Sequence, residues 1–340
     1  MTFTVRENVP LSQYTTLKVG GRARYFIEVK TMEDLEKAGQ FASQTALPFL
    51  VLGGGSNLLI SDHGFAGVVI FNQMKGREYK DNGDGTSILS VQAGEVFDEV
   101  IADTVSRGLW GLENLSSIPG TVGATPVQNV GAYGVEVGEL IVAVETYHLL
   151  TGIKKVFQKS ECDFGYRDSF FKTVVGKEYI ITTVHFKLNT TPEPKIKYAD
   201  LAKRFSETKP SQLEIREAVI DIRSKKFPDW HNLGTAGSFF KNPVISKVES
   251  EVLRSIYPEL PMYETEGGMI KISLGYVLDK ICNLKGYRDG NVELYTEQAL
   301  VLVNYGKENA NEIKKFTEKI TKIVFDKTKI IITPEVCFID

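Results

Sequence analysis

Three glycines in a row, Gly53 to Gly55, precede Ser56 and Asn57. Consecutive residues without a Cβ leave their backbone N–H groups uncovered, and such groups bind the oxygens of a pyrophosphate. The hydroxyl of Ser56 and the amide of Asn57 add side-chain donors beside them. Glycine is also used wherever a chain reverses through positive φ, so a tight hairpin turn explains the same run. On this run alone the turn is favoured, and phosphate binding is the alternative.

A second stretch rich in small residues lies between Ile118 and Gly134. A cofactor with a ring system, a ribitol chain, a pyrophosphate and an adenine needs two separated surfaces that it can approach closely. Two such stretches in one chain therefore suggest FAD. A Rossmann domain is disfavoured, because no G-x-G-x-x-G motif opens directly into a helix.

Three single polar residues stand in segments that could do chemistry. Arg167 lies in a polar and aromatic turn, where an arginine bonded to its neighbour Asp168 at a surface corner is the favoured interpretation. Ser238 has neither a G-x-S-x-G pattern nor a plausible histidine base, so nucleophilic catalysis is disfavoured and a turn serine is expected. Glu335 is an acid in an apolar terminal segment, where it either points to water or requires a partner, because burying an unpaired carboxylate is costly.

The chain shows no pattern of metal ligands. Its three cysteines form no C-x-x-C pair and its four histidines are dispersed, so we expect no metal site. An odd number of distant cysteines fits a reducing cytoplasm better than a disulfide framework.

These residues must be positioned by a mixture of helices and strands. Apolar residues at helical spacing predict helices over 31–47, 95–107 and 309–327. Capping boxes that begin at Ser211 and Ser246 predict two more helices. Apolar or alternating runs predict strands over 49–52, 58–60, 68–70, 88–91, 142–150 and 179–188. The glycine run therefore lies between two strands, and the segments 329–332 and 336–339 are expected to add a terminal strand to an earlier sheet.

Length and composition restrict the class of protein. A chain of 340 residues is too long for one ordinary core, and the order of the predicted elements suggests domain boundaries near residues 73 and 225–229. With 42% hydrophobic and 24% charged residues the composition is globular, and a net charge of −3 without a basic stripe makes nucleic acid an improbable partner. The N-terminus does not read as an export signal, and no run of eighteen apolar residues suggests a membrane span.

Six segments, taken in order, resemble a known family: the UDP-N-acetylenolpyruvoylglucosamine reductases, also called UDP-N-acetylmuramate dehydrogenases. The segments are 53–59 (GGGSNLL), 118–124 (IPGTVGA), 128–134 (QNVGAYG), 164–169 (FGYRDS), 236–243 (AGSFFKNP) and 334–336 (PEV). The likeness extends from one end of the chain to the other. It favours the type I subgroup, which carries an inserted tyrosine loop.

The resemblance implies an α+β fold, in which a two-part FAD-binding region of the vanillyl-alcohol-oxidase-like kind is joined to a C-terminal α/β substrate-binding domain. It implies a first FAD-binding subdomain over 1–72, completed by 328–340, a second over 73–225, and a substrate-binding domain over 226–327. The FAD is expected to be noncovalent. The residues expected to bind it are Gly53, Gly54, Gly55, Ser56, Asn57, Ile118, Pro119, Gly120, Gly123, Ala124, Gly131, Tyr133 and Gly134.

The resemblance also implies an activity: NADPH reduces the bound FAD, which then reduces UDP-N-acetylglucosamine-enolpyruvate to UDP-N-acetylmuramate for peptidoglycan synthesis in the cytoplasm. Arg167 and Glu335 are expected to stabilise charge on the enolpyruvyl group, and Ser238 is expected to donate a proton. The residues expected to bind substrate are Tyr198, Lys226, Asn242, Tyr263, Lys271 and Gln298. Relatives often carry an arginine where this chain has Cys337, which removes a second cationic contact from the expectation.

Two alternative functions come from other classes. The first is an FAD-dependent sugar or alcohol oxidase of the same superfamily, many members of which tether FAD through a histidine in the glycine-rich loop, where this chain has Ser56 and Asn57. The second is a non-catalytic module that binds FAD or a nucleotide sugar. We expect a monomer that acts without a nucleic acid or membrane partner.

Overall fold

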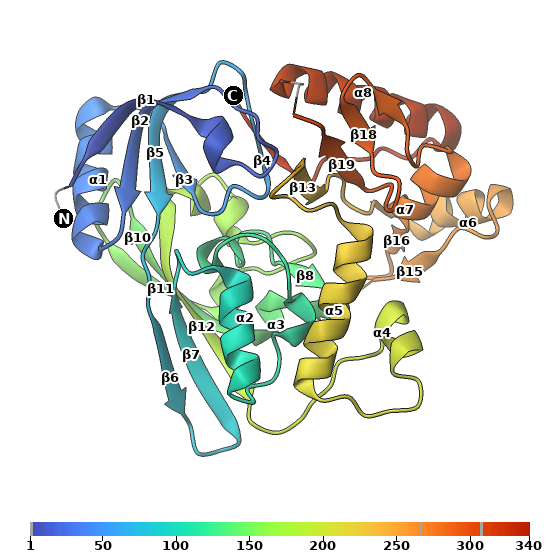
Figure 1. Ribbon diagram of the computed structural model, residues 1–340, viewed down its shortest axis with the longest axis horizontal. Helices are drawn as coiled ribbons and strands as arrows, with labels where there is room; N and C mark the ends of the chain where they lie inside the picture. Colours follow the sequence, from blue (N-terminus) through green and yellow to red (C-terminus); the bar gives the residue numbers. More distant parts are fainter. Residues whose placement is uncertain (1–2, 266, 307–308) are drawn as a thin grey trace. The chain divides into compact units, whose positions relative to one another are not determined.

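A computed structural model describes residues 3–265, 267–306 and 309–340, and the chain forms two compact units (Figure 1). Unit 1 consists of Met1–Val9, Ala23–Gly55 and Ala66–Arg223, and unit 2 consists of Pro10–Arg22, Ser56–Phe65 and Ser224–Asp340. The chain therefore passes between the units several times. The three-part division expected from the sequence, with boundaries after residues 72, 225 and 327, stays a prediction.

The first layer of unit 1 is a four-stranded sheet with the order β1-β2-β5-β3 and one covering helix. The strands are β1 (Val5–Pro10), β2 (Arg22–Val29), β3 (Phe49–Leu52) and β5 (Phe65–Asn72). Helix α1 (Met32–Thr45) begins with a capping box in which Thr31 and Asp34 bond each other's backbone N–H groups. Its buried residues Leu35 and Ala38 belong to one apolar cluster with residues of β2 and β5.

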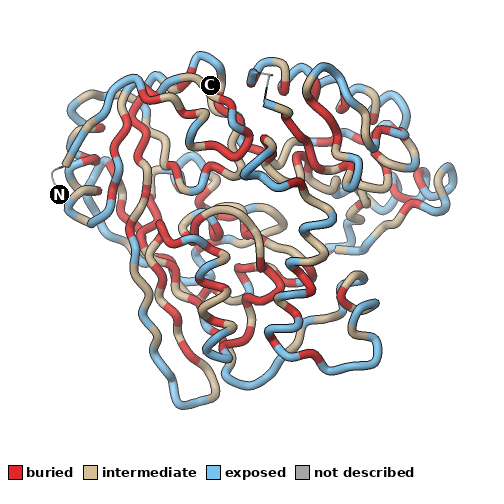
Figure 2. Tube along the Cα trace, viewed as in Figure 1, coloured by how far each residue is buried: buried red, intermediate tan, exposed pale blue. Residues whose placement is uncertain are grey.

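The second layer of unit 1 is an antiparallel five-stranded sheet with the order β11-β10-β12-β7-β6. The strands are β6 (Arg77–Asp81), β7 (Thr86–Gln92), β10 (Ile141–His148), β11 (Lys154–Gln158) and β12 (Tyr179–Asn189). Alternate residues of β7 are buried, and these pack with the buried face of helix α2 (Phe97–Ser106) in one cluster. Buried residues run along β7, β10 and β12, whereas the tip of the β6–β7 hairpin is exposed (Figure 2).

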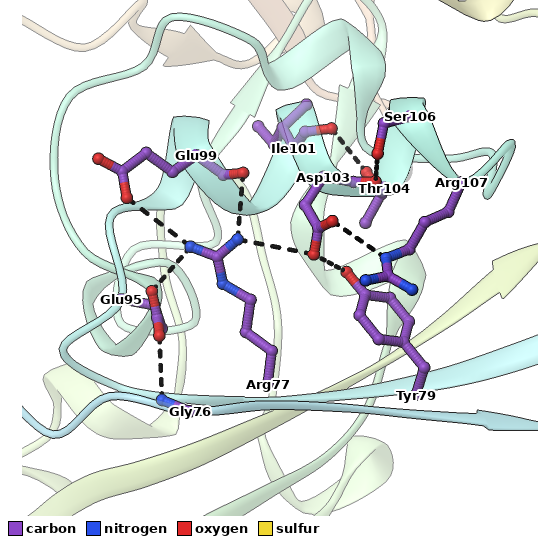
Figure 3. A network of polar contacts seen from close by, with 10 residues as sticks. All are labelled: Gly76, Arg77, Tyr79, Glu95, Glu99, Ile101, Asp103, Thr104, Ser106 and Arg107. Carbon is purple, nitrogen blue, oxygen red and sulfur yellow. Dashed lines mark hydrogen bonds and ion pairs between the residues drawn. The ribbon is translucent and has the colours of Figure 1, made fainter.

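A polar network joins the β6 edge of this sheet to α2 (Figure 3). Arg77 lies 2.8 Å from Glu95 and 3.6 Å from Asp103. The hydroxyl of Tyr79 donates to Asp103 at 2.6 Å, and the other oxygen of Glu95 accepts from the N–H of Gly76 at 3.0 Å. The network fixes the hairpin against the helix by charge-assisted hydrogen bonds.

We expect Asp103→Asn to destabilise the protein at neutral pH and to lose that effect in acid. Burial of Asp103 opposes its ionisation, but hydrogen bonds from Tyr79 and Arg107 and the charges of Arg107 and Arg77 outweigh burial and lower its pKa. A carboxylate whose pKa is lowered by folding stabilises the folded state above its unfolded pKa, and the stabilisation is lost as the pH falls through the folded pKa. The difference in melting temperature between wild type and variant should therefore shrink below about pH 4.

Glu99 provides the control for this prediction. Its carboxylate lies 3.7 Å from Arg77, and its side chain is 67% exposed. Exposed ion pairs contribute at most about 1 kcal/mol, so Glu99→Gln should change the melting temperature little at any pH. A difference for Asp103→Asn that stays constant from neutral pH to acid would contradict the account.

Unit 2 contains a four-stranded sheet, β13-β19-β18-β17, and a three-stranded sheet, β14-β16-β15. The strands of the first are β13 (Gly234–Ser238), β17 (Arg288–Asp289), β18 (Val292–Leu294) and β19 (Val301–Asn304), and those of the second are β14 (Val244–Ile245), β15 (Met262–Glu264) and β16 (Ile270–Ile272). Helices α6 (Lys247–Ile256), α7 (Leu274–Tyr276) and α8 (Ala310–Thr328) accompany them. One apolar cluster contains buried residues of both sheets and of α6, α7 and α8.

The C-terminal segment differs from the expectation in one part. No strand forms over 329–332, because α8 runs on to Thr328 and is closed by Lys329 in the left-handed conformation. The terminal strand is β20 (Cys337–Ile339), which pairs in parallel with β4 (Leu58–Ile60). The pairing of the last residues with an early strand is confirmed, and the strand prediction for 329–332 was wrong.

The remaining elements are short, except for helix α5 of 15 residues. They are β8 (Gly131–Ala132), β9 (Val135–Glu136), α3 (Val137–Leu140), α4 (Ala199–Arg204) and α5 (Gln212–Lys226), together with several turns of 3-10 helix. The mixture of helices with mainly antiparallel sheets confirms the α+β class. Within the residues that the structure describes, no helix is both long and apolar enough to cross a bilayer.

Candidate active site

The two glycine-rich loops of unit 1 lie directly against each other. Gly53 and Gly54 follow β3, and a Cβ added to Gly54 would lie 2.7 Å from Cα of Gly120. A Cβ added to Gly53 would meet the hydroxyl of Thr121. The sequence thus needs glycine here because two backbones approach more closely than a side chain allows. Two separated surfaces were expected from the sequence, whereas in unit 1 the two stretches meet at Gly54 and Gly120.

This surface suits a pyrophosphate. In the part of the chain that the structure describes, the N–H groups of Gly53, Gly54 and Gly55 donate to no backbone carbonyl. A run of uncovered N–H groups is the feature that binds phosphate oxygens, so the loop fits the pyrophosphate of FAD. The next two residues of the run, Ser56 and Asn57, fall in unit 2, where the Asn57 amide donates to the carbonyl of Glu335 at 3.3 Å.

Part of the second loop is explained by packing alone. Gly123 donates its N–H to the carbonyl of Ala93 at 2.9 Å, and a Cβ on Gly123 would lie 2.6 Å from Cβ of Ala93. Ala124 donates to Thr121 at 3.0 Å in a turn of 3-10 helix, and Ile118 packs beside the apolar cluster of the five-stranded sheet. Their expected contacts with FAD, like that of Pro119, stay predictions.

Asn129 organises the loop that contains Gly131, Tyr133 and Gly134. It is buried and adopts a left-handed φ of 44°. Its Oδ1 accepts from the N–H of Gly138 at 2.9 Å, while its Nδ2 donates to Glu136 at 2.7 Å and to the carbonyl of Gly165 at 3.0 Å. One side chain therefore ties this loop to the turn that contains Arg167.

Arg167 is held toward the same loop. It adopts a left-handed φ of 54° in a two-residue turn closed by hydrogen bonds between Gly165 and Asp168. Its guanidinium donates to the carbonyl of Gly131 at 2.7 Å, and its own carbonyl accepts from Lys172 at 2.9 Å. The half-buried arginine is thus anchored across the unit by a long-range bond, and the surface-corner interpretation does not account for it.

Tyr133 is the aromatic member of this loop, and its hydroxyl remains a donor at neutral pH. Burial raises the pKa of Tyr133 to about 12, against the charge and hydrogen bond of Arg223. Arg223 also donates to the carbonyl of Ser117 at 3.2 Å, and Ser117 donates its N–H to Asp98 at 2.6 Å. These bonds link the end of α5 to the second glycine-rich loop.

In unit 2 the segments that carry Ser238 and Glu335 lie side by side. Ser238 ends β13, and the next residue, Phe239, accepts a hydrogen bond from the N–H of Glu335 at 2.8 Å. Gly237 has a φ of 72°, and the pairing of β13 with β19 shifts register between Thr235 and Ser238. Such a bulge re-aims the residue that follows it. Ser238 and Glu335 are both half-buried, on adjacent antiparallel segments.

Four of the expected substrate-binding residues lie near one another in the same unit. Tyr263 and Lys271 are cross-strand partners in β15 and β16. Asn242 accepts from the N–H of Leu274 at 3.0 Å. A Cβ on the following residue, Gly275, would lie 3.4 Å from Oε1 of Gln298, so Asn242 and Gln298 both approach the start of α7.

The other two expected substrate-binding residues lie apart from this group in the chain. Lys226 is the last residue of α5 and falls in unit 2. Tyr198 falls in unit 1, where it precedes α4 and makes an edge-to-face contact with Tyr133 at 5.3 Å between ring centroids. Arg167 also belongs to unit 1, whereas Ser238 and Glu335 belong to unit 2.

Three residues that organise these loops were not predicted from the sequence: Asn129, Asn114 and Arg223. Asn129 carried a signal, since it stands before a glycine-rich turn, where asparagine is enriched at positive φ. Arg223 and Asn114 carried none, because their partners Ser117, Tyr133 and Lys195 are distant in the sequence.

Two family models match separate parts of the chain. Residues 23–151 match the model of an FAD-binding domain, and residues 229–339 match that of the C-terminal domain of UDP-N-acetylenolpyruvoylglucosamine reductase. The proteins of that name from Chromobacterium violaceum and Porphyromonas gingivalis are each 37% identical to this chain, over 98% of this chain and 99% of theirs. The crystal structure of the reductase from Thermus caldophilus superposes with a TM-score of 0.71 and 27% identity, over 100% of both chains.

The match to an FAD-binding domain, together with relatives named as a reductase, defines an FAD-dependent oxidoreductase. At 37% identity over almost its whole length, the chain belongs to the UDP-N-acetylenolpyruvoylglucosamine reductase family.

Proposed function

We propose that this protein reduces UDP-N-acetylglucosamine-enolpyruvate to UDP-N-acetylmuramate, with NADPH as the hydride donor and noncovalent FAD as the carrier, for the synthesis of peptidoglycan precursors. The observation that carries the proposal is that the N–H of Glu335 bonds the carbonyl of Phe239, the residue after Ser238, in a chain that also matches an FAD-binding domain. A hydroxyl and a carboxylate without a histidine base suit proton donation and charge control, not nucleophilic attack.

The chemistry that FAD supplies when bound is the transfer of a hydride, taken from NADPH and delivered to the terminal enolpyruvyl carbon. Gly53, Gly54 and Gly55 would hold its pyrophosphate through their uncovered N–H groups. Gly120 and the Gly131–Gly134 loop would accept the rest of the cofactor close to the backbone.

The residues of the chain complete the reduction. Ser238 gives the proton of its Oγ to the enolpyruvyl carbon beside the carboxylate, so that the double bond gains one hydride and one proton. Arg167 stabilises the negative charge that spreads into the substrate carboxylate, and its planar fork matches two carboxylate oxygens. Glu335 assists Ser238 at the carbon atom that receives the proton. The charge-assisted hydrogen bond from Arg167 to the substrate carboxylate contributes about 1.5–3 kcal/mol.

The UDP-sugar portion would be bound mainly by unit 2. Lys271 and Lys226 offer positive charge to the diphosphate, and Asn242 and Gln298 offer amide groups to the uridine or the sugar. Exposed aromatic rings complete the binding residues, Tyr263 from unit 2 and Tyr198 from unit 1.

The reaction is tested by mixing purified protein with NADPH and the enolpyruvyl substrate under anaerobic conditions. Consumption of NADPH should depend on the substrate, and the product should be heavier by two hydrogen atoms on mass spectrometry. NADPH consumption that requires oxygen instead would identify an oxidase, and FAD binding without any turnover would identify a non-catalytic module.

We expect the flavin to be released completely by acid precipitation. No histidine stands in the run from Gly53 to Asn57, and the uncovered N–H groups there bind phosphate without a covalent bond. After precipitation the yellow colour should remain in the supernatant, as measured by its absorbance. Colour that stays in the protein pellet would show a covalent link and favour the oxidase alternative.

The setting of the enzyme follows from its substrates. NADPH and a UDP-activated sugar are metabolites of the cytoplasm, so we place the protein there and propose that it acts as a monomer without a nucleic acid or membrane partner. Size-exclusion chromatography with light scattering measures the oligomeric state directly.

A further inference from the structure

One fully buried side chain connects two segments that the proposed function assigns to different ligands. The Nδ2 of Asn114 donates to the carbonyl of Tyr133 at 2.9 Å and to the carbonyl of Lys195 at 2.7 Å. Tyr133 belongs to a loop proposed to bind FAD. Lys195 stands three residues before Tyr198, which is proposed to bind the UDP-sugar. A single amide group therefore fixes the separation of the two segments.

The turn that carries Asn114 is itself rigid. Glu113 is buried, and its carboxylate accepts from the N–H of Gly111 at 2.7 Å and from the amide of Gln212 at 3.2 Å. The carbonyl of Glu113 accepts from the hydroxyl of Ser116 at 2.6 Å. Because these bonds lock the turn, the direction of the Asn114 amide is determined by the core and not by the loops that it joins.

The two connected segments also touch through their side chains. The rings of Tyr133 and Tyr198 meet edge to face, with 76° between their planes. Beneath them Tyr133 packs with Trp110, Leu201 of α4 and Ile215 of α5 in a small apolar cluster. Tyr198 is 46% exposed, so its outer face is accessible while its inner face rests on Tyr133.

We propose that Asn114 is a positioning residue for the substrate stage of the reaction, an inference that rests on the proposed substrate-binding role of Tyr198. By holding the carbonyls of Tyr133 and Lys195, it keeps the Tyr198 ring in the orientation that receives the UDP-sugar. The Asn114 amide donates to backbone carbonyls, which every residue type has. The side chain of residue 195 is therefore unimportant for these bonds, whereas the amide of residue 114 is required. Asn114 touches neither hydride nor proton donor, so it acts on binding and not on chemistry.

The test compares two buried amides of unit 1. Asn114→Leu keeps nearly the same volume and removes both donations. Asn72→Leu is the matched control, because Asn72 is also buried and its amide donates to the carbonyl of Ile181 at 3.1 Å, but not to Tyr133 or Lys195. Asn114→Leu should raise the KM for the enolpyruvyl substrate about tenfold, with kcat and the KM for NADPH nearly unchanged. Asn72→Leu should leave all three within about twofold.

A second readout does not depend on activity. Hydrogen exchange of residues 193–204 should be faster in Asn114→Leu than in Asn72→Leu or wild type, because the segment loses its attachment. If the wild type shows no turnover, the proposed function fails while the exchange result still tests the attachment. If Asn114→Leu yields little folded protein, Asn114→Ser, which keeps one donor, replaces it and should show a smaller change of the same kind. Equal exchange in both variants, or an equal rise in KM, would overturn the proposal.

Discussion

Ser238→Ala should leave the reduction of the flavin by NADPH nearly intact and reduce its reoxidation by the enolpyruvyl substrate by about 100- to 10,000-fold. The proton is needed only when the double bond is reduced, and Ser238 ends β13 after a shift of register, next to the residue that Glu335 bonds. Stopped-flow absorbance of the flavin measures the two stages separately.

Ser255→Ala is a suitable control for this prediction. It removes a hydroxyl from the same unit, but Ser255 lies on α6, where its Oγ donates to the carbonyl of Val252 at 2.7 Å. Both stages should keep their wild-type rates in this variant. If Ser238→Ala slows both stages equally, the residue contributes to the common site and is not the proton donor.

Gly54→Ala should weaken FAD binding by about 10- to 100-fold and lower the melting temperature of the apoprotein. An added Cβ would lie 2.7 Å from Cα and 3.3 Å from the carbonyl carbon of Gly120. Both are backbone atoms, so one loop must move, and overpacking of this kind costs about 1–3 kcal/mol. The displaced loop is the one whose N–H groups are proposed to face the pyrophosphate. Titration of apoprotein with FAD, followed by quenching of flavin fluorescence, measures the change.

Gly53→Ala provides an internal comparison because its clash is with a side chain. The added Cβ would meet the hydroxyl of Thr121, and in its absence the nearest atom would be Cβ of residue 121, at an ordinary 3.7 Å. The defect in Gly53→Ala should therefore be smaller and should be relieved in the double variant Gly53→Ala/Thr121→Ala. FAD binding of wild-type strength in Gly54→Ala would contradict the proposed role of the glycine run.

The local features of the fold were predictable because their partners are close in sequence. The capping boxes at Ser211 and Ser246 form as expected, each between residues three positions apart. From Thr182 to Leu188 buried residues of β12 alternate with less buried ones, because one face of the sheet lies against the core. The position of the glycine run between two strands was predictable for the same reason.

The features that the sequence did not reveal depend on distant partners. A β-branched run such as 330–332 forms a strand only where a neighbouring strand is available, and here the last segment forms a strand only from Cys337 onward. Arg167 bonds the carbonyl of Gly131, which lies 36 positions away, and Asn114 bonds the carbonyl of Lys195, which lies 81 positions away. Both acceptors are backbone atoms, which every residue type has, so the sequence carries no signal of these bonds. The family resemblance identified Arg167 as important, but the anchoring that holds it emerged from the structure alone.

The most direct test of the proposed reaction follows the colour of the flavin without oxygen. NADPH is added to the purified yellow protein until the colour bleaches, and UDP-N-acetylglucosamine-enolpyruvate is then added. We predict that the colour returns in proportion to the substrate, because the reduced flavin passes its hydride to the enolpyruvyl carbon. Colour that stays bleached with the substrate and returns only with oxygen would contradict the reductase and favour the oxidase.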